Sequence, residues 1–335
     1  MKQIAVIGAG SWGTALGIIA GRAGHGVRLW SRNREVVEAI NHEHVNSIYL
    51  APHEIPSNVR ATAELEEALT GAEIVVLAAP SHVTRELLVR MQPFLQPSMI
   101  FVSATKGIET ETGKRISEVV REVTAEKFDA RFVCLSGPSF AQEVAGGQPT
   151  AIVAASINRE ESRLVQNILS FQNLRIYTNT DVVGTEIGGS VKNVMAVAAG
   201  MVAGLGLGTN SVAALITRGL AEVARLALAE GARHETLMGL AGMGDLVLTC
   251  TGNLSRNRFV GQELGRGRAL SDIIGGMREV AEGIKTTRAV KLLAQRLGVE
   301  MPITREVHAV LYEGKRAKDA ASELMTRPLR DEFER

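Results

Sequence analysis

The sequence contains few cysteines and no excess of charge of either sign. Its 335 residues include only 2 cysteines, Cys134 and Cys250, and each lies within an apolar stretch. Neither a disulfide framework nor a metal cluster is therefore indicated, and we expect no metal site. The 37 basic residues nearly balance the 36 acidic ones, so no overall field would attract a polyanion. We therefore expect no nucleic-acid partner.

The sequence shows no internal repeat and no low-complexity stretch, and we expect no targeting segment. Its N-terminus leads directly into a short apolar strand, without the basic and apolar regions of a signal peptide. We therefore expect a cytoplasmic protein. A length of 335 residues exceeds one typical hydrophobic core, which predicts two domains, 1–180 and 181–335.

One stretch, from Val194 to Gly208, contains no polar side chain. A helix in this stretch would be apolar on every face, so it must lie inside the protein. The stretch is shorter than the roughly 20 apolar residues that cross a bilayer. We therefore expect no membrane insertion.

A single lysine, Lys192, stands at the head of this apolar run, next to Asn193. Burial at the start of such a helix would remove water from the ammonium group, which lowers its pKa toward neutral pH. A lysine with such a pKa can donate and accept protons. The alternative is a lysine that reaches the surface or pairs with Glu186, and this stretch alone does not decide between the two.

A glycine-rich turn follows the first strand. The apolar residues 3–7 predict a buried parallel strand, and the spacing G-x-G-x-x-G follows, before a helix predicted at 14–23. Gly8 would permit the tight bend, Gly10 would let the backbone approach a pyrophosphate, and Gly13 would let the helix pack on the sheet. We interpret this turn as a dinucleotide site; the alternative is an ordinary turn between a strand and a helix.

The second strand, predicted at 27–30, ends without the acidic residue that usually binds the ribose hydroxyls of NAD. Ser31 and Arg32 follow it instead. An arginine at this position suits the 2′-phosphate of NADP, so we expect NADPH to be used at least as well as NADH. The alternative is a solvated basic turn on the surface.

Strands and helices alternate up to about residue 180. Further strands are predicted at 73–80, 99–103, 131–135, 150–155 and 174–177, with a helix at 81–91. This alternation is typical of a doubly wound sheet, in which ligands bind at the carboxyl ends of the strands. Lys106 follows one such end, where it is either a ligand residue or a plain surface lysine. A turn that could face the same ligand follows another strand, at Gly137, Ser139 and Ala141.

The pattern beyond residue 181 is helical. Residues 211–233 place apolar and charged side chains on opposite faces of a helix, which core packing explains. Asp245 then leaves a glycine-rich turn, and the polar residues that follow it include Thr249, Ser255, Arg256 and Asn257. A guanidinium group beside a hydroxyl and an amide can bind phosphate through charge-assisted hydrogen bonds, although Arg256 suits a helical i,i+4 pair equally well.

Eight motifs taken together resemble the bacterial NAD(P)H-dependent glycerol-3-phosphate dehydrogenases. They are, in chain order, IGAGSWGTA, SATKGIE, LSGPSFAQEV, GGSVKNVMAVAAGM, RGLAE, LAGMGDLVLTC, SRNR and VAEGIKT. The resemblance covers nearly the whole chain, and the order and spacing of the motifs are highly specific. Ser190 stands where this motif more often has alanine. The resemblance implies an α/β fold, with an N-terminal Rossmann-type doubly wound sheet, an all-α C-terminal domain and an active site between them.

The resemblance also implies an activity and a set of site residues. The activity is the reversible, NAD(P)H-dependent reduction of dihydroxyacetone phosphate to sn-glycerol 3-phosphate for phospholipid synthesis. Lys192 would be the catalytic proton donor and acceptor, and Asp245 its partner. The substrate would also contact Lys106, Gly137, Ser139, Thr249, Ser255, Arg256 and Asn257. The nucleotide would contact Gly8, Gly10, Ser11, Trp12, Gly13, Arg32, Lys106, Ala141, Arg256, Val280 and Glu282.

Two other functions are weighed against this one. Related hydroxyacid dehydrogenases have an asparagine four residues after the lysine, whereas this chain has Ala196 there and an asparagine next to Lys192. A non-catalytic regulator that senses nucleotides would keep the glycine-rich turn, but it would not need Lys192, Asp245 and Arg256 around a second ligand. We also expect a small phosphate substrate and, by default, a homodimer.

Overall fold

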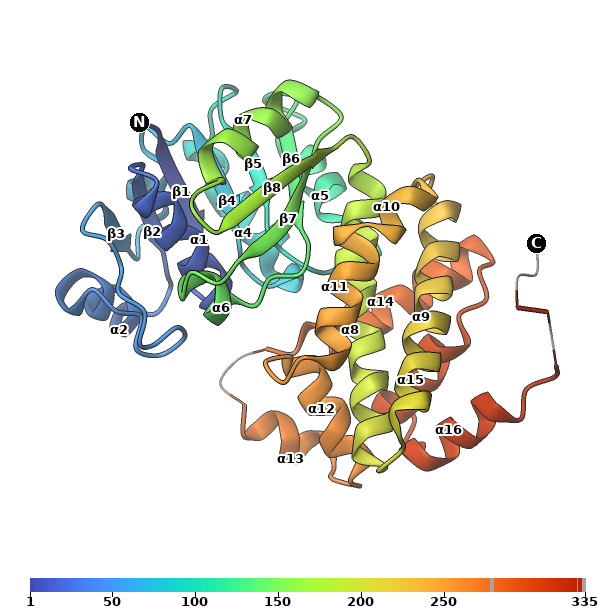
Figure 1. The fold of residues 1–335 in the computed structure, drawn as a ribbon. Helices are drawn as coiled ribbons and strands as arrows, with labels where there is room; N and C mark the ends of the chain where they lie inside the picture. Colours follow the sequence, from blue (N-terminus) through green and yellow to red (C-terminus); the bar gives the residue numbers. More distant parts are fainter. Residues whose placement is uncertain (278–279, 330, 333–335) are drawn as a thin grey trace.

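The computed structural model describes residues 1–277, 280–329 and 331–332. Two regions lie side by side in it (Figure 1). The sheet region carries strands β1 to β8, from Gln3 to Asn179, and the helical region carries helices α8 to α16, from Val182 to Met325. The predicted fold class, a sheet region followed by helices, is confirmed. The division into domains 1–180 and 181–335 stays a prediction.

The sheet has 8 strands in the order β3-β2-β1-β4-β5-β6-β7-β8. Neighbouring strands are parallel, apart from the antiparallel pair β6 and β7. The order reverses between β1 and β4, and ligands bind in the crevice outside the carboxyl ends of the strands at such a point. The strands are β1 Gln3–Ile7, β2 Gly26–Trp30, β3 Val59–Thr62, β4 Ile74–Leu77, β5 Ile100–Ser103, β6 Arg131–Ser136, β7 Thr150–Ala155 and β8 Leu174–Asn179.

Each of the seven strands predicted from the sequence is present, with bounds that differ by at most three residues. The sequence did not predict β3 or the antiparallel pairing of β6 with β7. Strand β3 is an edge strand of 4 residues, VRAT, and it includes two polar side chains. Such a short segment lacks the continuous apolar run that marks a strand buried on both faces.

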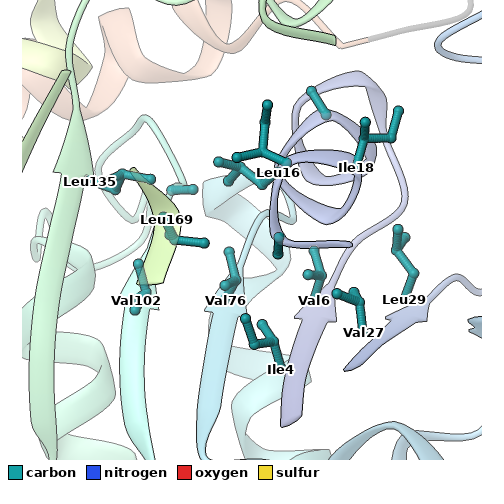
Figure 2. Close-up of a cluster of buried hydrophobic side chains, with 14 of the residues drawn as sticks. Ile4, Val6, Leu16, Ile18, Val27, Leu29, Val76, Val102, Leu135 and Leu169 are labelled. Atoms are coloured by element: carbon teal, nitrogen blue, oxygen red, sulfur yellow. The ribbon is translucent and has the colours of Figure 1, made fainter. Parts of the chain in front are cut away.

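Helices cover both faces of the sheet. On one face, α1, α6 and α7 pack on the strands; Figure 2 shows Leu16 of α1 on the same side of the sheet as Val6 of β1 and Val76 of β4. On the other face, α3, α4 and α5 pack on alternate residues of the same strands. The helices of this region are α1 Ser11–Arg22, α2 Arg34–Glu38, α3 Leu65–Leu69, α4 Thr84–Met91, α5 Ile116–Thr124, α6 Ala141–Ala145 and α7 Arg159–Leu169.

Helix α8 lies at the centre of the helical region, and α9, α11, α12 and α14 pack around it. Helix α12 approaches closely: a Cβ atom added to Gly200 would lie 2.0 Å from the carbonyl oxygen of Arg258. A larger residue there would push the two helices apart. The helices are α8 Val182–Gly204, α9 Thr209–Ala229, α10 His234–Met238, α11 Asp245–Thr251, α12 Arg256–Gly265, α13 Leu270–Gly275, α14 Glu282–Leu297, α15 Pro302–Tyr312 and α16 Ala317–Met325.

Helix α8 differs from the helix expected around Lys192. It begins at Val182, after Asp181 has capped it by accepting the Gly184 N–H at 2.8 Å, so Lys192 lies in its middle rather than at its head. With 23 residues it is long enough to cross a membrane, so the expectation that it is too short was wrong. Burial identifies it as a core helix instead, because 83% of its most apolar window lies inside the protein.

Candidate active site

Lys192 forms its hydrogen bonds with helix α11. Its Nζ atom donates to Oδ1 of Asp245 and, at 2.8 Å, to the hydroxyl of Thr249, which lies one turn further along the same face. Lys192 is 5% exposed and Asp245 is 0% exposed, so both charges are out of water. Glu186 is not the partner of this lysine, because its carboxylate accepts hydrogen bonds from Ser117. The alternative of a surface lysine or a Glu186 pair is therefore wrong.

A second lysine reaches the same carboxylate from the sheet region. Lys106 follows β5, and its Nζ atom donates to Oδ2 of Asp245 at 2.9 Å and to the carbonyl oxygen of Gly137 at 3.2 Å. The hydroxyl of Ser139 donates to the same carbonyl oxygen at 3.0 Å. The carboxylate of Asp245 thus lies between two ammonium groups, one from each region.

Burial lowers the pKa of Lys192 to about 7, because the ammonium group loses its water. The negative charge of Asp245 acts against this shift, whereas the positive charge of Lys106 adds to it. Near neutral pH the side chain therefore exchanges between ammonium and amine. A group that donates and accepts protons during a reaction needs a pKa in this range.

Helix α12 begins close to Lys192. The Nδ2 atom of Asn257 donates to Oδ1 of Asn193 at 2.9 Å, and its Oδ1 atom accepts the backbone N–H of Gly283 at 2.8 Å. These two bonds fix the start of α12 against α8 and α14. The first N–H groups of a helix have no partner within it, and together with the helix dipole they favour an anion. This end of α12 is therefore suited to a negatively charged ligand.

Arg256 is the first residue of α12, and its side chain is exposed. Ser255 precedes it as the helix cap, since its hydroxyl accepts a backbone N–H of the first turn at 3.2 Å. Burial raises the pKa of Glu282, and the nearby charge of Arg256 acts against this rise. Arg256 thus lies near the start of α14. Gly252 and Val260, four residues before and after it, carry no charge, so an i,i+4 ion pair does not account for Arg256.

The three glycines of the turn after β1 have different surroundings. Gly8 has a φ of 120°, which favours glycine. A Cβ atom on Gly13 would lie 1.9 Å from the carbonyl oxygen of Gly8, so close packing of α1 requires glycine there. A Cβ atom on Gly10 would have no described heavy atom within 4 Å. The fold itself therefore does not require a glycine at position 10, whereas a ligand that approaches the backbone would.

Two buried polar atoms at this edge of the sheet are suited to a nucleotide. Nε1 of Trp12 and Oε1 of Glu282 have no hydrogen-bond partner in the described part of the chain. The other carboxylate oxygen of Glu282 accepts the hydroxyl of Ser81, which follows β4, at 2.7 Å. A buried donor and a buried acceptor without partners are costly unless a ligand binds them. Together with the open space at Gly10, they fit a dinucleotide along the carboxyl edge of the sheet.

The other predicted cofactor residues lie along the same edge. Ser11 begins α1, and its hydroxyl donates to the carbonyl oxygen of Tyr49 at 2.9 Å. Ala141 begins α6, and Val280, which precedes α14, is exposed. Arg32 is exposed just after β2, and β1 and β4 separate that strand from β5. Hydrogen bonds thus join Lys106, Lys192 and Thr249 to Asp245, whereas Arg32 lies at the other end of the crevice.

Two residues of the site were not predicted, Ser81 and Asn46. Ser81 follows the carboxyl end of β4, the same kind of position that singled out Lys106 after β5, so the same rule would have found it. Asn46 is 0% exposed and donates to the carbonyl oxygen of Ala9 at 2.9 Å and to the hydroxyl of Thr14 at 2.8 Å. It holds the glycine-rich turn in shape from a distant loop, and no local sequence signal marks it.

Comparison with known proteins identifies the family. Residues 3–162 match the model of the NAD-dependent glycerol-3-phosphate dehydrogenase N-terminus, and residues 181–322 match that of the C-terminus. Proteins named glycerol-3-phosphate dehydrogenase (NAD(P)+) from Koribacter versatilis and Geobacter sulfurreducens are 57% and 52% identical, over 98% and 99% of both chains respectively. The crystal structure of glycerol-3-phosphate dehydrogenase from Coxiella burnetii superposes with a TM-score of 0.93, at 41% identity over 97% of this chain and 99% of that chain. The resemblance carried by the sequence motifs is thus confirmed: the chain is an NAD(P)-dependent oxidoreductase and belongs to the NAD-dependent glycerol-3-phosphate dehydrogenase family.

Proposed function

We propose that this chain reduces dihydroxyacetone phosphate to sn-glycerol 3-phosphate, and that Lys192 supplies the proton. Glycerol-3-phosphate dehydrogenase activity follows from the family; the direction and the roles of the residues are the proposal. The observation that carries it is the buried ammonium group of Lys192, held by Asp245, with a pKa of about 7. Such a group carries its proton for part of the time at neutral pH, as a general acid and base must.

Each charged group at the site has a separate task. The reduced nicotinamide supplies the hydride for the ketone carbon. Lys192 donates a proton to the ketone oxygen as it becomes an alkoxide, and it accepts that proton in the reverse reaction. Asp245 and Thr249 accept two of its three N–H groups, which directs the third toward the substrate. Lys106 adds positive charge where negative charge develops on the oxygen.

The phosphate group of the substrate binds at the start of α12. Arg256 can donate two parallel N–H bonds to phosphate oxygens, and the first backbone N–H groups of the helix face the same anion. Asn257 supports this arrangement because it ties the start of α12 to Asn193, the residue next to Lys192. The ketone end of a small substrate then lies at Lys192 and its anionic end at Arg256.

The dinucleotide binds along the carboxyl edge of the sheet, with its pyrophosphate at Gly10 and at the start of α1. Trp12 offers it a buried donor and Glu282 a buried acceptor, neither of which has a partner among the described residues. Arg32 binds the 2′-phosphate of NADPH at the far end. Both NADPH and NADH therefore serve as cofactors.

The test follows the absorbance of the reduced cofactor after the protein is mixed with NADPH and dihydroxyacetone phosphate. We expect rapid oxidation of NADPH. Unphosphorylated dihydroxyacetone is the matched control for the phosphate, and pyruvate represents the substrates of hydroxyacid dehydrogenases; both should react far more slowly. Faster turnover of pyruvate, or no oxidation with any of the three, would overturn the proposed function.

We also propose that the product enters phospholipid synthesis and that the chain works in the cytoplasm as a homodimer. Glycerol 3-phosphate is the backbone from which glycerophospholipids are built. The burial of α8 supports a protein that does not insert into a membrane, and dimers with twofold symmetry are the commonest oligomers. Analytical ultracentrifugation should give twice the mass of one chain; the mass of a single chain would exclude the dimer.

A further inference from the structure

A buried carboxylate of the helical region caps a helix of the sheet region. Glu186 lies on α8, and its two oxygens accept the backbone N–H of Ser117 at 2.8 Å and the hydroxyl of the same residue at 2.6 Å. Ser117 lies in the first turn of α5, where backbone N–H groups have no partner within the helix. Arg115, the residue before α5, donates to the same carboxylate at 3.3 Å. Glu186 is 7% exposed and Ser117 is 1% exposed, so these bonds are made out of water.

The segment that ends at this cap begins with Lys106. Residues 106–115 form an arm between β5 and α5, and Arg115 pairs with Ile108 in an antiparallel bridge. Ile108 is 1% exposed and belongs to the apolar core of the helical region. The arm is therefore attached to the helical region at Ile108 and at Arg115. Its start is attached to the sheet region, because the hydroxyl of Thr105 donates to the carbonyl oxygen of Ala79 at 2.9 Å, and Lys106 lies between these attachments.

We propose that Glu186 is a positioning residue for the reduction: it holds the end of the arm, and the arm carries Lys106 to Asp245. The proposal rests on the proposed function, in which Lys106 takes part in the chemistry. With glutamine at position 186, the amide oxygen still accepts one bond, but an NH2 group replaces the second acceptor and the negative charge near Arg115 is lost. Of the described carboxylates, Arg115 would then keep only Glu118 at 3.2 Å and Glu230 at 3.6 Å, and the end of the arm would shift in response. A shift of about 1 Å at a reacting group can cost roughly 10²-fold in rate.

The arm also bears on the proton chemistry of Lys192. Two charged groups act on Lys192 from the elements around it: Asp245, which raises its pKa, and Lys106, which lowers it. The thiol of Cys250 also lies near Lys192, but burial raises its pKa to about 12, so it stays neutral over the pH range of the test. When the arm shifts, Lys106 moves away from Asp245, and the pKa of Lys192 rises. The loss of reduction at alkaline pH should then move to higher pH. We call this fall in kcat/KM at alkaline pH the alkaline limb of the pH profile. If Glu186 served stability alone, its substitution would lower the Tm and leave the alkaline limb at the same pH.

The experiment compares Glu186→Gln with Glu222→Gln. Glu222 is also a buried glutamate that accepts N–H groups at the start of a helix, from Ile303 at 2.6 Å and Thr304 at 3.3 Å, but all three residues lie in the helical region. At pH 7, Glu186→Gln should lower kcat/KM for dihydroxyacetone phosphate about 10- to 100-fold and move the alkaline limb upward. Glu222→Gln should change kcat/KM by less than about twofold and leave the limb in place.

The double variant with Lys106→Met tests whether the effect runs through Lys106. In that background Glu186→Gln should lower kcat/KM no further, because the ammonium group that it positions is gone. Three outcomes would overturn the positioning role of Glu186 and leave the proposed function intact. They are an unchanged kcat/KM in Glu186→Gln, an unchanged pH at which its activity falls, and a loss from Glu186→Gln in the double variant equal to its loss in the wild-type background. Wild-type kcat/KM in Lys106→Met would overturn the proposed function of Lys106, and the positioning role with it.

Ser117→Ala keeps the test decisive if Glu186→Gln does not fold. It removes only the hydroxyl donor and leaves the carboxylate and the backbone N–H in place. We expect kcat/KM to fall about 2- to 10-fold, with the same upward movement of the alkaline limb and no further loss in the Lys106→Met background. A wild-type pH profile in folded Ser117→Ala would contradict the positioning role.

Discussion

The glycine-rich turn after β1 and the lysine site on α8 are built by different means. The turn depends on the shape of its backbone: Gly8 takes a φ of 120°, and Gly13 packs against it. The lysine site depends on side-chain charges: Asp245 accepts hydrogen bonds from Lys192, 53 residues away in the sequence, and from Lys106, 139 residues away. A local sequence specifies the first site, whereas the second exists only when the two regions have come together.

The two sites also differ in their electrostatics. The turn presents neutral N–H groups, so no charge has to be taken out of water before a ligand binds. The lysine site buries charged groups, which is costly unless they are paired, and this burial brings the pKa of Lys192 to about 7. Changes in the turn should therefore act on cofactor binding, whereas changes at the lysine site should act on turnover.

The largest effect is expected from Lys192→Met. Methionine keeps most of the length of the side chain but has no proton to donate, so kcat should fall roughly 10²- to 10⁴-fold. Binding of NADPH, measured by titration of its fluorescence, should stay near wild type because the turn is unchanged. A folded variant that retained its turnover would exclude Lys192 as the proton donor. It would also contradict the expectation that changes at the lysine site act on turnover.

Arg256→Ala tests how much the phosphate group of the substrate contributes to kcat/KM, apart from the ketone. Loss of a charged partner of a buried group costs roughly 2 to 5 kcal/mol, which is about 30-fold to several thousandfold in kcat/KM. Reduction of dihydroxyacetone phosphate should fall by this factor, and the slow reduction of unphosphorylated dihydroxyacetone should change much less. The measurement is the ratio of the two kcat/KM values. An unchanged ratio would assign the phosphate to another residue, with Lys106 the next candidate.

Gly10→Val tests whether a change in the glycine-rich turn acts on cofactor binding. The backbone of Gly10 is extended, with φ −72° and ψ −177°, and an added Cβ atom meets no described heavy atom within 4 Å, so the Tm should stay near wild type. The new side chain would occupy the place of the pyrophosphate, and the KM for NADPH should rise about tenfold or more. Gly13→Val is the matched control, because it should lower the Tm. A wild-type KM in Gly10→Val would contradict the pyrophosphate position.

The smallest effect is expected from Arg32→Asp. Loss of an exposed guanidinium group should raise the KM for NADPH about tenfold. The KM for NADH should stay near wild type, because NADH has no 2′-phosphate. The ratio of the two KM values is the measurement. An equal response of both cofactors would show that Arg32 does not bind the 2′-phosphate.

The same contrast explains what the sequence could predict. The glycine-rich turn and the unusual position of Lys192 were visible because their signals are local: a glycine spacing and one charge in an apolar run. The partnership of Lys192 with Asp245 came from the family resemblance alone. The bonds of Glu186 to Ser117 and of Glu282 to Ser81 were not predicted, because each joins residues from the two regions and no short pattern encodes such a contact.

The proton role of Lys192 is tested most directly by the pH dependence of kcat/KM for dihydroxyacetone phosphate at saturating NADPH, which reports groups of the enzyme before this substrate binds. Reduction needs the ammonium form, so kcat/KM should be constant at acidic pH and fall as the pH rises through about 7. Oxidation of glycerol 3-phosphate needs the amine form, so its kcat/KM should rise through the same pH. A kcat/KM for reduction that stays constant through this range, or an unchanged inflection in Lys192→Met, would contradict Lys192 as the proton donor.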